Sequence, residues 1–258
     1  MEDKKVVFFD IDGTLLHEGS YIPPSTIAAI QQLRHNGVET FIATGRGPAM
    51  LSDIPEQLGI DSFVCYNGQI VVHQGEVVYR NTLPTDALRR LTDHAGSNDH
   101  TLVYLGQHRG GATKANDHVV EQSLGELDMP IPTYDPNFHI EQAVYQTLLY
   151  CTPEEEHHYL DAYGEFDFIR WHPHAMDVIN RGASKADGIR HFIETNGYRL
   201  ENTYAFGDAL NDLAMLQYVG TGIAMGNARV EAKEVADFVT KSILEDGIEY
   251  GLKSMKLI

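Results

Sequence analysis

The stretch Val6-Val7-Phe8-Phe9-Asp10-Ile11-Asp12-Gly13-Thr14 joins a short apolar run to two acidic residues. Four consecutive apolar residues, two of them β-branched and two aromatic, predict a strand that is buried on both faces of a parallel sheet. The Gly-Thr pair then breaks the strand into a turn. In open α/β sheets, ligands bind in the crevice beyond the carboxyl ends of the strands. The stretch therefore predicts an α/β fold with Asp10 and Asp12 at a ligand site.

Two neighbouring carboxylates need a compensating charge. At an effective dielectric constant near 20, two like charges about 4 Å apart repel each other by roughly 4 kcal/mol. We therefore expect a cation or a shared proton near Asp10 and Asp12. A turn without a ligand is the alternative, because Asp-x-Asp-Gly is good turn chemistry and also begins some calcium loops. A calcium loop is disfavoured, because Tyr21 stands where the loop needs a Glu and no helix is expected before Asp10.

Size and composition limit the classes of function. A chain of 258 residues suits one large domain or two smaller ones, and its 22% of charged residues is ordinary for a globular protein. The net charge of −18 argues against nucleic acid and anionic membranes as partners. We expect a cytoplasmic protein, because no apolar run reaches membrane-spanning length and the N-terminus lacks a signal-peptide pattern. Cys65 and Cys151 lie in apolar runs and are expected to be buried free thiols.

Polar residues also follow two later strands of the predicted sheet. Residues 40–43 form an apolar run that ends in Thr44-Gly45-Arg46, and residues 62–66 form another that ends in Asn67-Gly68. A strand, a helix and a further strand make a right-handed crossover unit, so these ends should lie at the same sheet edge as Asp10. Helices are expected at about residues 27–36 and 48–58, and a hairpin at residues 70–72 and 77–79.

The character of the sequence changes near residue 83. The central segment has no buried strand that ends in acidic residues. We therefore predict that residues 83–183 form an α+β domain inserted into a catalytic core domain of residues 1–82 and 184–258. Within the insertion we expect helices at residues 85–95 and 116–125, a Gly-rich turn at 106–111, a Pro-rich loop at 129–137, and strands at 101–105, 146–151, 166–171 and 175–180.

The first pattern returns after the insertion. Ser184-Lys185 begins a predicted helix, and the buried strand at residues 203–206 ends in Gly207-Asp208-Ala209-Leu210-Asn211-Asp212. Two further strands are expected at residues 222–225 and 237–240, and a terminal helix at residues 242–257. The acid-ended strand thus occurs twice, at Asp10 and at Asp208.

The strand-end residues together suit phosphoryl transfer. Several carboxylates at one sheet edge require a cation, and hard oxygen ligands select Mg²⁺. A lysine, a threonine hydroxyl and backbone N–H groups can hold an anion beside it. Phosphoryl transfer needs these parts, with one carboxylate as nucleophile and a neighbouring carboxyl group as general acid and base. The residues concerned are Asp10, Asp12, Thr44, Lys185, Asp208, Asn211 and Asp212.

Four motifs in order resemble the haloacid dehalogenase-like (HAD) superfamily, and most closely its Cof-like type IIB phosphatases. They are the Asp10–Thr14 stretch, Thr44-Gly45-Arg46, Ser184-Lys185 followed by Gly188, and Gly207–Asp212. The insertion between the second and third motifs has the place and size of the type IIB cap. The resemblance implies a Rossmann-like parallel-sheet core with an inserted α+β cap domain that determines substrate specificity.

The resemblance also implies roles for the motif residues. Asp10 would be the nucleophile and Asp12 the general acid and base. The phosphoryl group would be held by Thr44, Gly45, Lys185, Asn211 and the Ile11 backbone. Mg²⁺ would be bound by Asp10, the Asp12 carbonyl, Asp208 and Asp212.

Simpler interpretations exist for several of these residues. Lys185, taken alone, suits a solvated first helical turn, and Asp212 suits a charge complement at a helix N-terminus. Arg46 is either a substrate contact or a structural ion-pair partner. Asn67-Gly68 is either a plain turn or the floor of the site.

The insertion offers weaker candidates. Arg170, Trp171 and His172 lie near the end of a predicted strand in the region where type IIB caps contact substrate, which makes Arg170 and His172 candidate substrate contacts. The pairs His157-His158 and His172/His174 resemble metal ligands, but each lacks a third ligand at usable spacing. They are expected to be surface or core histidines.

We expect a Mg²⁺-dependent phosphatase of small phosphorylated metabolites, such as sugar or cofactor phosphates, that works as a monomer or homodimer. A phosphomutase is one alternative, because it shares the nucleophile chemistry. A phospho-acceptor signalling domain is another, because receiver domains also combine Asp clusters with Thr or Ser and Lys. Receivers are about half this length and lack an acid/base two residues after the acceptor.

Overall fold

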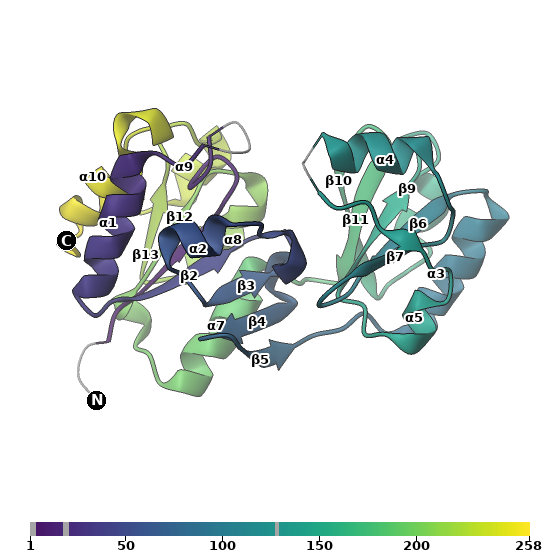
Figure 1. The fold of residues 1–258 in the computed structure, drawn as a ribbon, viewed down its shortest axis with the longest axis horizontal. Helices are drawn as coiled ribbons and strands as arrows, with labels where there is room; N and C mark the ends of the chain where they lie inside the picture. The colour runs from purple at the N-terminus through teal and green to yellow at the C-terminus, as the bar shows by residue number, and fades with distance from the viewer. Residues whose placement is uncertain (1–3, 18–20, 127–128) are drawn as a thin grey trace. The chain divides into compact units, whose positions relative to one another are not determined.

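The computed structural model describes residues 4–17, 21–126 and 129–258 (Figure 1). The chain forms two compact units. The core unit consists of the chain up to Arg46, Leu51–Tyr79 and Ser184–Ile258, and the inserted unit consists of Gly47–Met50 and Arg80–Ala183. Each unit has a sheet of its own.

The core sheet places β1 (Val6–Phe9) between two parallel neighbours, β2 (Glu39–Ala43) and β12 (Thr203–Gly207). All four side chains of β1 are fully buried, as its apolar run predicts. The strand order is β14-β13-β12-β1-β2-β3-β4-β5. The other strands are β3 (Phe63–Cys65), β4 (Ile70–His73), β5 (Glu76–Arg80), β13 (Thr221–Ala224) and β14 (Phe238–Val239). The strands from β14 to β3 are parallel, so their carboxyl ends lie at one edge of the sheet. The next strand, β4, runs antiparallel to β3.

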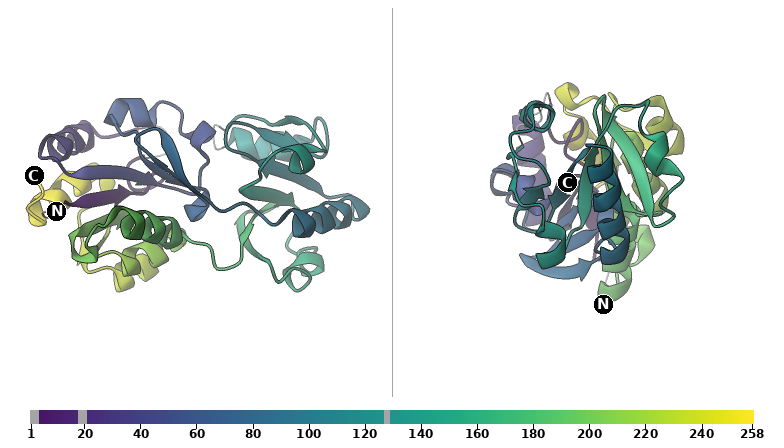
Figure 2. Two further views of the ribbon diagram at one scale, coloured as in Figure 1. Left: turned by 90° about the horizontal axis from the view of Figure 1, so that it is seen from below. Right: turned by 90° about the vertical axis from the view of Figure 1, so that its right-hand side faces the viewer.

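Helices cover both faces of this sheet. In the left view of Figure 2, α1 (Pro24–His35) and α2 (Ile54–Leu58) lie on one face, and α7 (Lys185–Asn196) and α8 (Leu213–Tyr218) on the other. The side chains of β1 alternate between the two layers: the Phe8 ring contacts Phe192 of α7, and the Phe9 ring stacks on Phe206. The remaining core helices are α9 (Val230–Val235) and α10 (Gly247–Ser254).

Two predicted helices of the core are shorter than the sequence pattern suggests. The segment predicted as residues 48–58 contains a 3₁₀ turn at Pro48–Met50 and then α2, with Ser52 in a left-handed conformation between them. The predicted terminal helix begins as a 3₁₀ turn at Ile243–Glu245, and Asp246 at φ 59° separates it from α10. A left-handed residue interrupts the helical hydrogen-bond ladder in each case.

The inserted unit contains a mixed sheet in the order β10-β11-β9-β6-β7-β8. Its strands are β6 (Thr101–Leu105), β7 (Gly110–Ala112), β8 (Thr133–Tyr134), β9 (Gln146–Tyr150), β10 (Phe166–His172) and β11 (Ala175–Asn180). Its helices are α3 (Thr85–Ser97), α4 (His118–Gly125), α5 (Phe138–Glu141) and α6 (His157–Leu160). Apolar side chains of α3 and Phe138 of α5 pack with one face of β6, β9, β10 and β11 in a single buried cluster.

Two strands of the insertion lie in segments whose glycine and proline content predicts a turn and a loop. The predicted Gly-rich turn supplies β7, and the predicted Pro-rich loop contains β8. Gly111 is needed in β7 because a Cβ there would lie 2.8 Å from the Phe138 side chain. The predicted fold class, a Rossmann-like parallel core with an inserted α+β cap, is otherwise confirmed.

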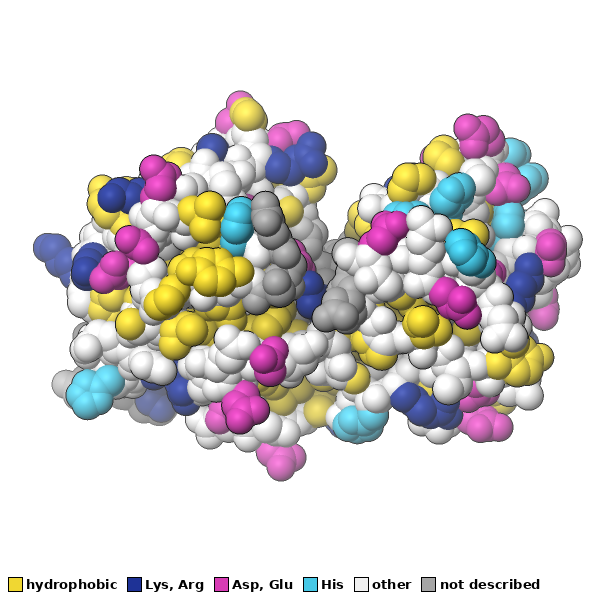
Figure 3. Space-filling model, turned by 45° about the horizontal axis from the view of Figure 1, so that its top comes forward, with side chains coloured by type: hydrophobic (Ala, Val, Ile, Leu, Met, Phe, Trp, Pro, Cys, Tyr) yellow, Lys and Arg dark blue, Asp and Glu magenta, His cyan; other side chains and the backbone are white. Residues whose placement is uncertain are grey.

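The distribution of surface charge is a separate observation, whereas the two cysteines match the expectation of buried free thiols. Acidic side chains are scattered over the face shown in Figure 3 and do not gather in one patch. Cys65 and Cys151 are both free and buried. Among the described residues, no helix combines the length and apolar character needed to cross a membrane.

Candidate active site

Three carboxylates meet at the carboxyl edge of the core sheet. Asp10 follows β1, Asp208 follows β12, and Asp212 ends the 3₁₀ turn Leu210–Asp212. One oxygen from each carboxylate lies within 4.8 Å of the other two. They meet because β1 and β12 are parallel neighbours. Within the described ranges, no other set of three or more metal-binding side chains is this close together.

Lys185 links two of these carboxylates. Its side chain is fully buried, and its Nζ donates to Asp10 Oδ1 and, at 2.6 Å, to Asp212 Oδ1. Lys185 is the first residue of α7, whose start is fixed because the Ser184 backbone N–H and hydroxyl both donate to Asp187 Oδ2 at 2.8 Å. The simpler interpretation of Lys185, as a solvated first-turn residue, is therefore wrong.

The cluster carries more negative than positive charge. Burial raises the pKa of Asp10 well above its usual range, and the Asp212 charge adds to this. Burial also raises the pKa of Asp208 to about 6, with a further contribution from Asp212. Burial alone would lower the pKa of Lys185, but Asp10 and Asp212 outweigh this effect and raise it. Buried carboxylate oxygens with excess negative charge fit a hard divalent cation.

Asp212 is held from two directions. Its Oδ1 accepts from Lys185, and its Oδ2 accepts from the backbone N–H groups of Asp208 and Ala209, both at 2.9 Å. Its side chain is fully buried. The arrangement turns one Asp212 oxygen toward the cluster and uses the other to shape the turn after β12. A simple surface charge at a helix terminus does not describe this residue.

The turn after Asp10 packs directly against Asp208. Thr14 Oγ1 donates to Asp208 Oδ1 at 2.7 Å. Gly13 has φ +88°, and a Cβ at this position would lie 2.3 Å from Asp208 Oδ2. Asn227 Nδ2 donates to Gly13 O at 2.7 Å. The sequence pattern predicts neither contact: Thr14 belongs to a turn motif, and Asn227 stands in a polar loop that carries no signal of its own.

A second turn brings Thr44, Asn67 and Asn211 together. Thr44 is 1% exposed at the end of β2, and its carbonyl accepts from Asn67 N–H at 3.1 Å. Asn67 has a left-handed backbone, and its Oδ1 accepts from Asn211 Nδ2 at 3.4 Å. Gly45 lies next to the Asn67 side chain. A Cβ on Gly45 would be 3.4 Å from both the nitrogen and the oxygen of the Asn67 amide. These residues therefore add uncharged polar groups to the site at the same edge of the sheet.

Asp12 lies outside the acidic cluster and pairs with Arg46. Arg46 Nε donates to Asp12 Oδ2 at 3.0 Å, and Arg46 Nη2 donates to Asp12 Oδ1 at 2.6 Å. Of the two interpretations of Arg46, the structure displays the ion pair.

The carbonyl of Ile11 organises the turn after β1. It accepts three hydrogen bonds, from the N–H groups of Thr14, Leu15 and Leu16.

The candidate residues of the inserted unit make contacts within that unit. Arg170 Nε donates to Glu156 at 2.9 Å, and its Nη1 donates to the carbonyls of Cys151, His172 and Pro173 at 3.1 to 3.2 Å. His172 Nε2 lies 3.6 Å from Glu126, and its Nδ1 accepts from the His174 N–H. The structure places both residues at the β10–β11 hairpin.

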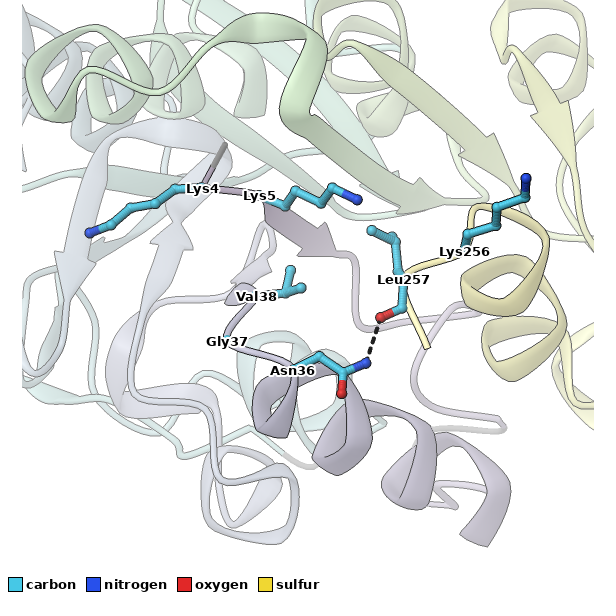
Figure 4. Close-up of a pocket in the computed structure, with 7 residues that line it drawn as sticks. All are labelled: Lys4, Lys5, Asn36, Gly37, Val38, Lys256 and Leu257. Atoms are coloured by element: carbon cyan, nitrogen blue, oxygen red, sulfur yellow. Dashed lines mark hydrogen bonds between the residues drawn. The ribbon is translucent and has the colours of Figure 1, made fainter. Parts of the chain in front are cut away.

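Two cavities of the core unit differ in their relation to the site. One, of about 230 Å³, opens beside the turn after Asp10 and is lined by Asp12, Gly13, Leu16, His17, Asn227, Ser242, Ile243 and Leu244. The other, of about 470 Å³, lies where β1 and β2 begin, at the opposite edge of the sheet. Lys4, Lys5 and Lys256 line it, but the Lys4 and Lys5 side chains point in opposite directions (Figure 4). The two lysine ammonium groups therefore do not converge on one point of this second cavity.

Comparison with known proteins places this arrangement in a family. Residues 7–252 match the haloacid dehalogenase-like hydrolase family. The chain is 46% identical over 256 residues to YkrA of Bacillus subtilis (strain 168), which carries the name of a phosphatase, and covers 99% of both proteins. It is 29% identical over 273 residues to the 5-amino-6-(5-phospho-D-ribitylamino)uracil phosphatase YitU of the same strain, covering 98% of each.

Solved structures agree with these relatives. A protein from Geobacillus kaustophilus HTA426 superposes with a TM-score of 0.95 at 48% identity, covering 99% of this chain and all of the other. The HAD subclass IIB sugar phosphatase BT4131 superposes with a TM-score of 0.85 at 33% identity, with the same coverage. The chain therefore belongs to the haloacid dehalogenase-like hydrolase family, in its Cof-like subclass IIB, and is a phosphatase that acts on phosphoric esters.

Proposed function

We propose that this protein is a Mg²⁺-dependent phosphatase of small phosphorylated metabolites that works through an aspartyl-phosphate on Asp10. One observation carries the proposal: the Asp10 carboxylate shares a buried cluster with Asp208 and Asp212 and pairs with Lys185. A nucleophilic carboxylate beside a metal site and a fixed ammonium group has the charge environment that phosphoryl transfer requires.

The metal site would use oxygen ligands only. Asp10, Asp208, Asp212 and the main-chain carbonyl of Asp12 would hold Mg²⁺, which when bound neutralises charge on the phosphoryl oxygens. The raised pKa values of Asp10 and Asp208 support this assignment, because a bound cation would remove the repulsion that contributes to them.

The reaction would proceed in two displacements. Asp10 attacks phosphorus, the bond from phosphorus to the leaving oxygen breaks, and Asp12 gives that oxygen a proton. Water then attacks the aspartyl-phosphate, its proton passes to Asp12, and inorganic phosphate leaves Asp10 as a carboxylate. We assign the positioning of the phosphoryl group to Thr44, Lys185, Asn211 and the backbones of Ile11 and Gly45.

Thr44 is prepared for this task. Its Oγ1 accepts a hydrogen bond from the Arg46 N–H at 3.0 Å, so the hydroxyl proton is left to donate to a phosphoryl oxygen. Lys185 is held by two carboxylates without side-chain freedom, so it needs no ordering when the phosphoryl group arrives. Both features favour a site that is organised before substrate binds.

The substrate class follows from the relatives and from the insertion. A sugar phosphatase and a ribitylaminouracil phosphatase among the similar proteins support sugar or cofactor phosphates. We propose that residues 1–82 and 184–258 form the catalytic core and that residues 83–183 form a cap that selects the substrate. The proposed substrate contacts are Asn67, Gly68, Arg170 and His172.

The test is a screen of phosphorylated metabolites for phosphate release, with Mg²⁺ or with a chelator. The panel includes hexose phosphates, pentitol phosphates and p-nitrophenyl phosphate. We expect release that depends on Mg²⁺ and favours one or a few metabolites. Release from no member of the panel, p-nitrophenyl phosphate included, would overturn the proposal, and release that is equal with chelator would overturn the metal assignment.

A further inference from the structure

We propose that Arg46 is the positioning residue of the general acid and base, acting on the reaction through Asp12 and not through the substrate. This inference rests on the proposed function. It concerns an ion pair that lies wholly within the core unit and joins residues 34 positions apart in the chain.

The two partners differ in how firmly they are held. The Arg46 side chain is 12% exposed, whereas the Asp12 side chain is 55% exposed. The Arg46 backbone is fixed at both ends, because its N–H donates to Thr44 Oγ1 at 3.0 Å and its carbonyl accepts from the Tyr66 N–H at 3.0 Å. The arginine is thus the anchored partner, and the exposed aspartate is the group that is oriented.

The contact constrains Asp12 more than a single hydrogen bond would. Two guanidinium nitrogens bind the two carboxylate oxygens separately, at 3.0 and 2.6 Å, which fixes the plane of the carboxylate as well as its position. Each oxygen keeps a further lone pair, which can carry the proton that is given to the leaving oxygen and can later accept a proton from water. An exposed Asp without this contact would sample several rotamers, and misplacing a proton-transfer group is costly to rate.

The same geometry bears on the other role considered for Arg46, a direct contact to substrate. Its Nε and Nη2 are both committed to Asp12, and the guanidinium is largely covered. The Nε/Nη2 edge is one of the two edges with which a guanidinium can bind a phosphate as a fork, and here Asp12 occupies it. An arginine occupied in this way acts by placing its carboxylate partner.

The prediction concerns dependence on the leaving group. Phenyl phosphate and p-nitrophenyl phosphate are similar in shape, but phenolate needs a proton as it leaves far more than p-nitrophenolate does. A residue that acts through the general acid should therefore matter for the first substrate and little for the second. We expect Arg46→Ala to lower kcat/KM at least about tenfold for phenyl phosphate, and less than about threefold for p-nitrophenyl phosphate.

A double-mutant cycle with Asp12→Asn provides the second arm. If Arg46 acts through Asp12, removing Arg46 in the Asp12→Asn background should change the rate of p-nitrophenolate release and the kcat/KM for phenyl phosphate by less than about twofold. Arg46→Lys, which keeps the charge but not the bidentate fork, should fall between wild type and Arg46→Ala for phenyl phosphate. Arg89→Lys is the matched control, because Arg89 forms an exposed pair with Asp86 at 3.4 Å on the surface of α3.

Two results would overturn the inference: equal losses of kcat/KM on both aryl phosphates, or an Arg46→Ala loss that persists in full when Asp12 is Asn. The first outcome describes a structural role and the second a direct substrate contact. Thermal unfolding of each variant identifies general loss of structure. If Arg46→Ala is unfolded, the comparison of the two aryl phosphates is made with Arg46→Lys instead. An inactive wild-type enzyme would instead count against the proposed phosphatase chemistry, so the two failures are distinguishable.

Discussion

Gly68 lies so close to Ser184 that a Cβ on the glycine would come within 2.1 Å of the Ser184 carbonyl oxygen. The turn after β3 thus packs against the first residue before α7, the helix that carries Lys185. Gly188, one turn further along α7, has the same requirement, because its Cβ would lie 2.9 Å from Gly68 Cα. The close approach of two backbones therefore sets where the buried lysine enters the acidic cluster.

We expect Gly68→Ala to lower both stability and kcat. The backbone has φ +94°, which costs an alanine about 1 kcal/mol or more, and the Cβ would also push α7 and Lys185 away from Asp10. Denaturant unfolding and steady-state kinetics measure the two effects. Gly75→Ala is the matched control, because Gly75 has φ +82° but nothing within 4 Å of its Cβ position. Equal stability losses in the two variants, with normal kcat, would contradict the packing argument.

We expect Asp10→Asn to abolish hydrolysis and leave the fold intact. A carboxamide is a poor nucleophile and a poor Mg²⁺ ligand, while it keeps the size of the side chain. Activity should fall below a few per cent of wild type, and circular dichroism should be unchanged. Asp86→Asn, at a highly exposed position in α3, controls for loss of one surface charge. Retention of substantial turnover by Asp10→Asn would reject Asp10 as the nucleophile.

The raised pKa of Asp208 predicts how stability depends on pH without metal. Burial, with a contribution from Asp212, raises its pKa from 3.8 to about 6, so the folded state binds this proton more tightly than the unfolded state. The stabilisation is full below the unfolded value and is lost as pH rises through about 6. We expect the free energy of unfolding of metal-free wild type to fall, relative to Asp208→Asn, between about pH 4 and pH 7.

Mg²⁺ should reverse this trend, because the ionised carboxylate is the form that binds it. Thermal melts of both proteins at several pH values, with chelator or with Mg²⁺, provide the measurement. A wild-type curve that runs parallel to that of Asp208→Asn would show that Asp208 does not titrate differently in the two states.

Arg170→Ala should raise KM for the physiological substrate without abolishing hydrolysis of a small aryl phosphate. The guanidinium at the β10–β11 hairpin also binds Glu156, so a purely structural role must be separated from substrate contact. Glu156→Gln weakens the same ion pair and leaves the arginine in place. A raised KM in Arg170→Ala but not in Glu156→Gln supports contact, and an unchanged KM in Arg170→Ala rejects it.

The acid-ended strands were predictable because two signals coincide in them. A buried apolar run fixes each strand, and parallel pairing of β1 with β12 then brings Asp10 and Asp208 to one edge even though about two hundred residues separate them. The order of the four motifs identified the family for the same reason: each motif marks the end of a strand or the start of a helix at that edge.

The missed features depend on contacts that no local pattern encodes. Asn227 reaches Gly13 across the edge of the sheet, and its own loop sequence resembles any polar turn. The pairing of Arg46 with Asp12 depends on how two turns face each other, so sequence left its role open. In the inserted unit, β7 is glycine-rich because Phe138 packs on Gly111, and sequence alone interprets such glycines as a turn.

The central position of β1 has a consequence for synthesis of the chain. Its hydrogen-bonding partner on one side, β12, is translated almost two hundred residues later. Until Thr203–Gly207 leaves the ribosome, this wholly apolar strand of the nascent polypeptide has an open edge, a state prone to aggregation. A product truncated before that segment would lack both a complete sheet and the Asp208 carboxylate, so it would be inert as an enzyme and a target for chaperones.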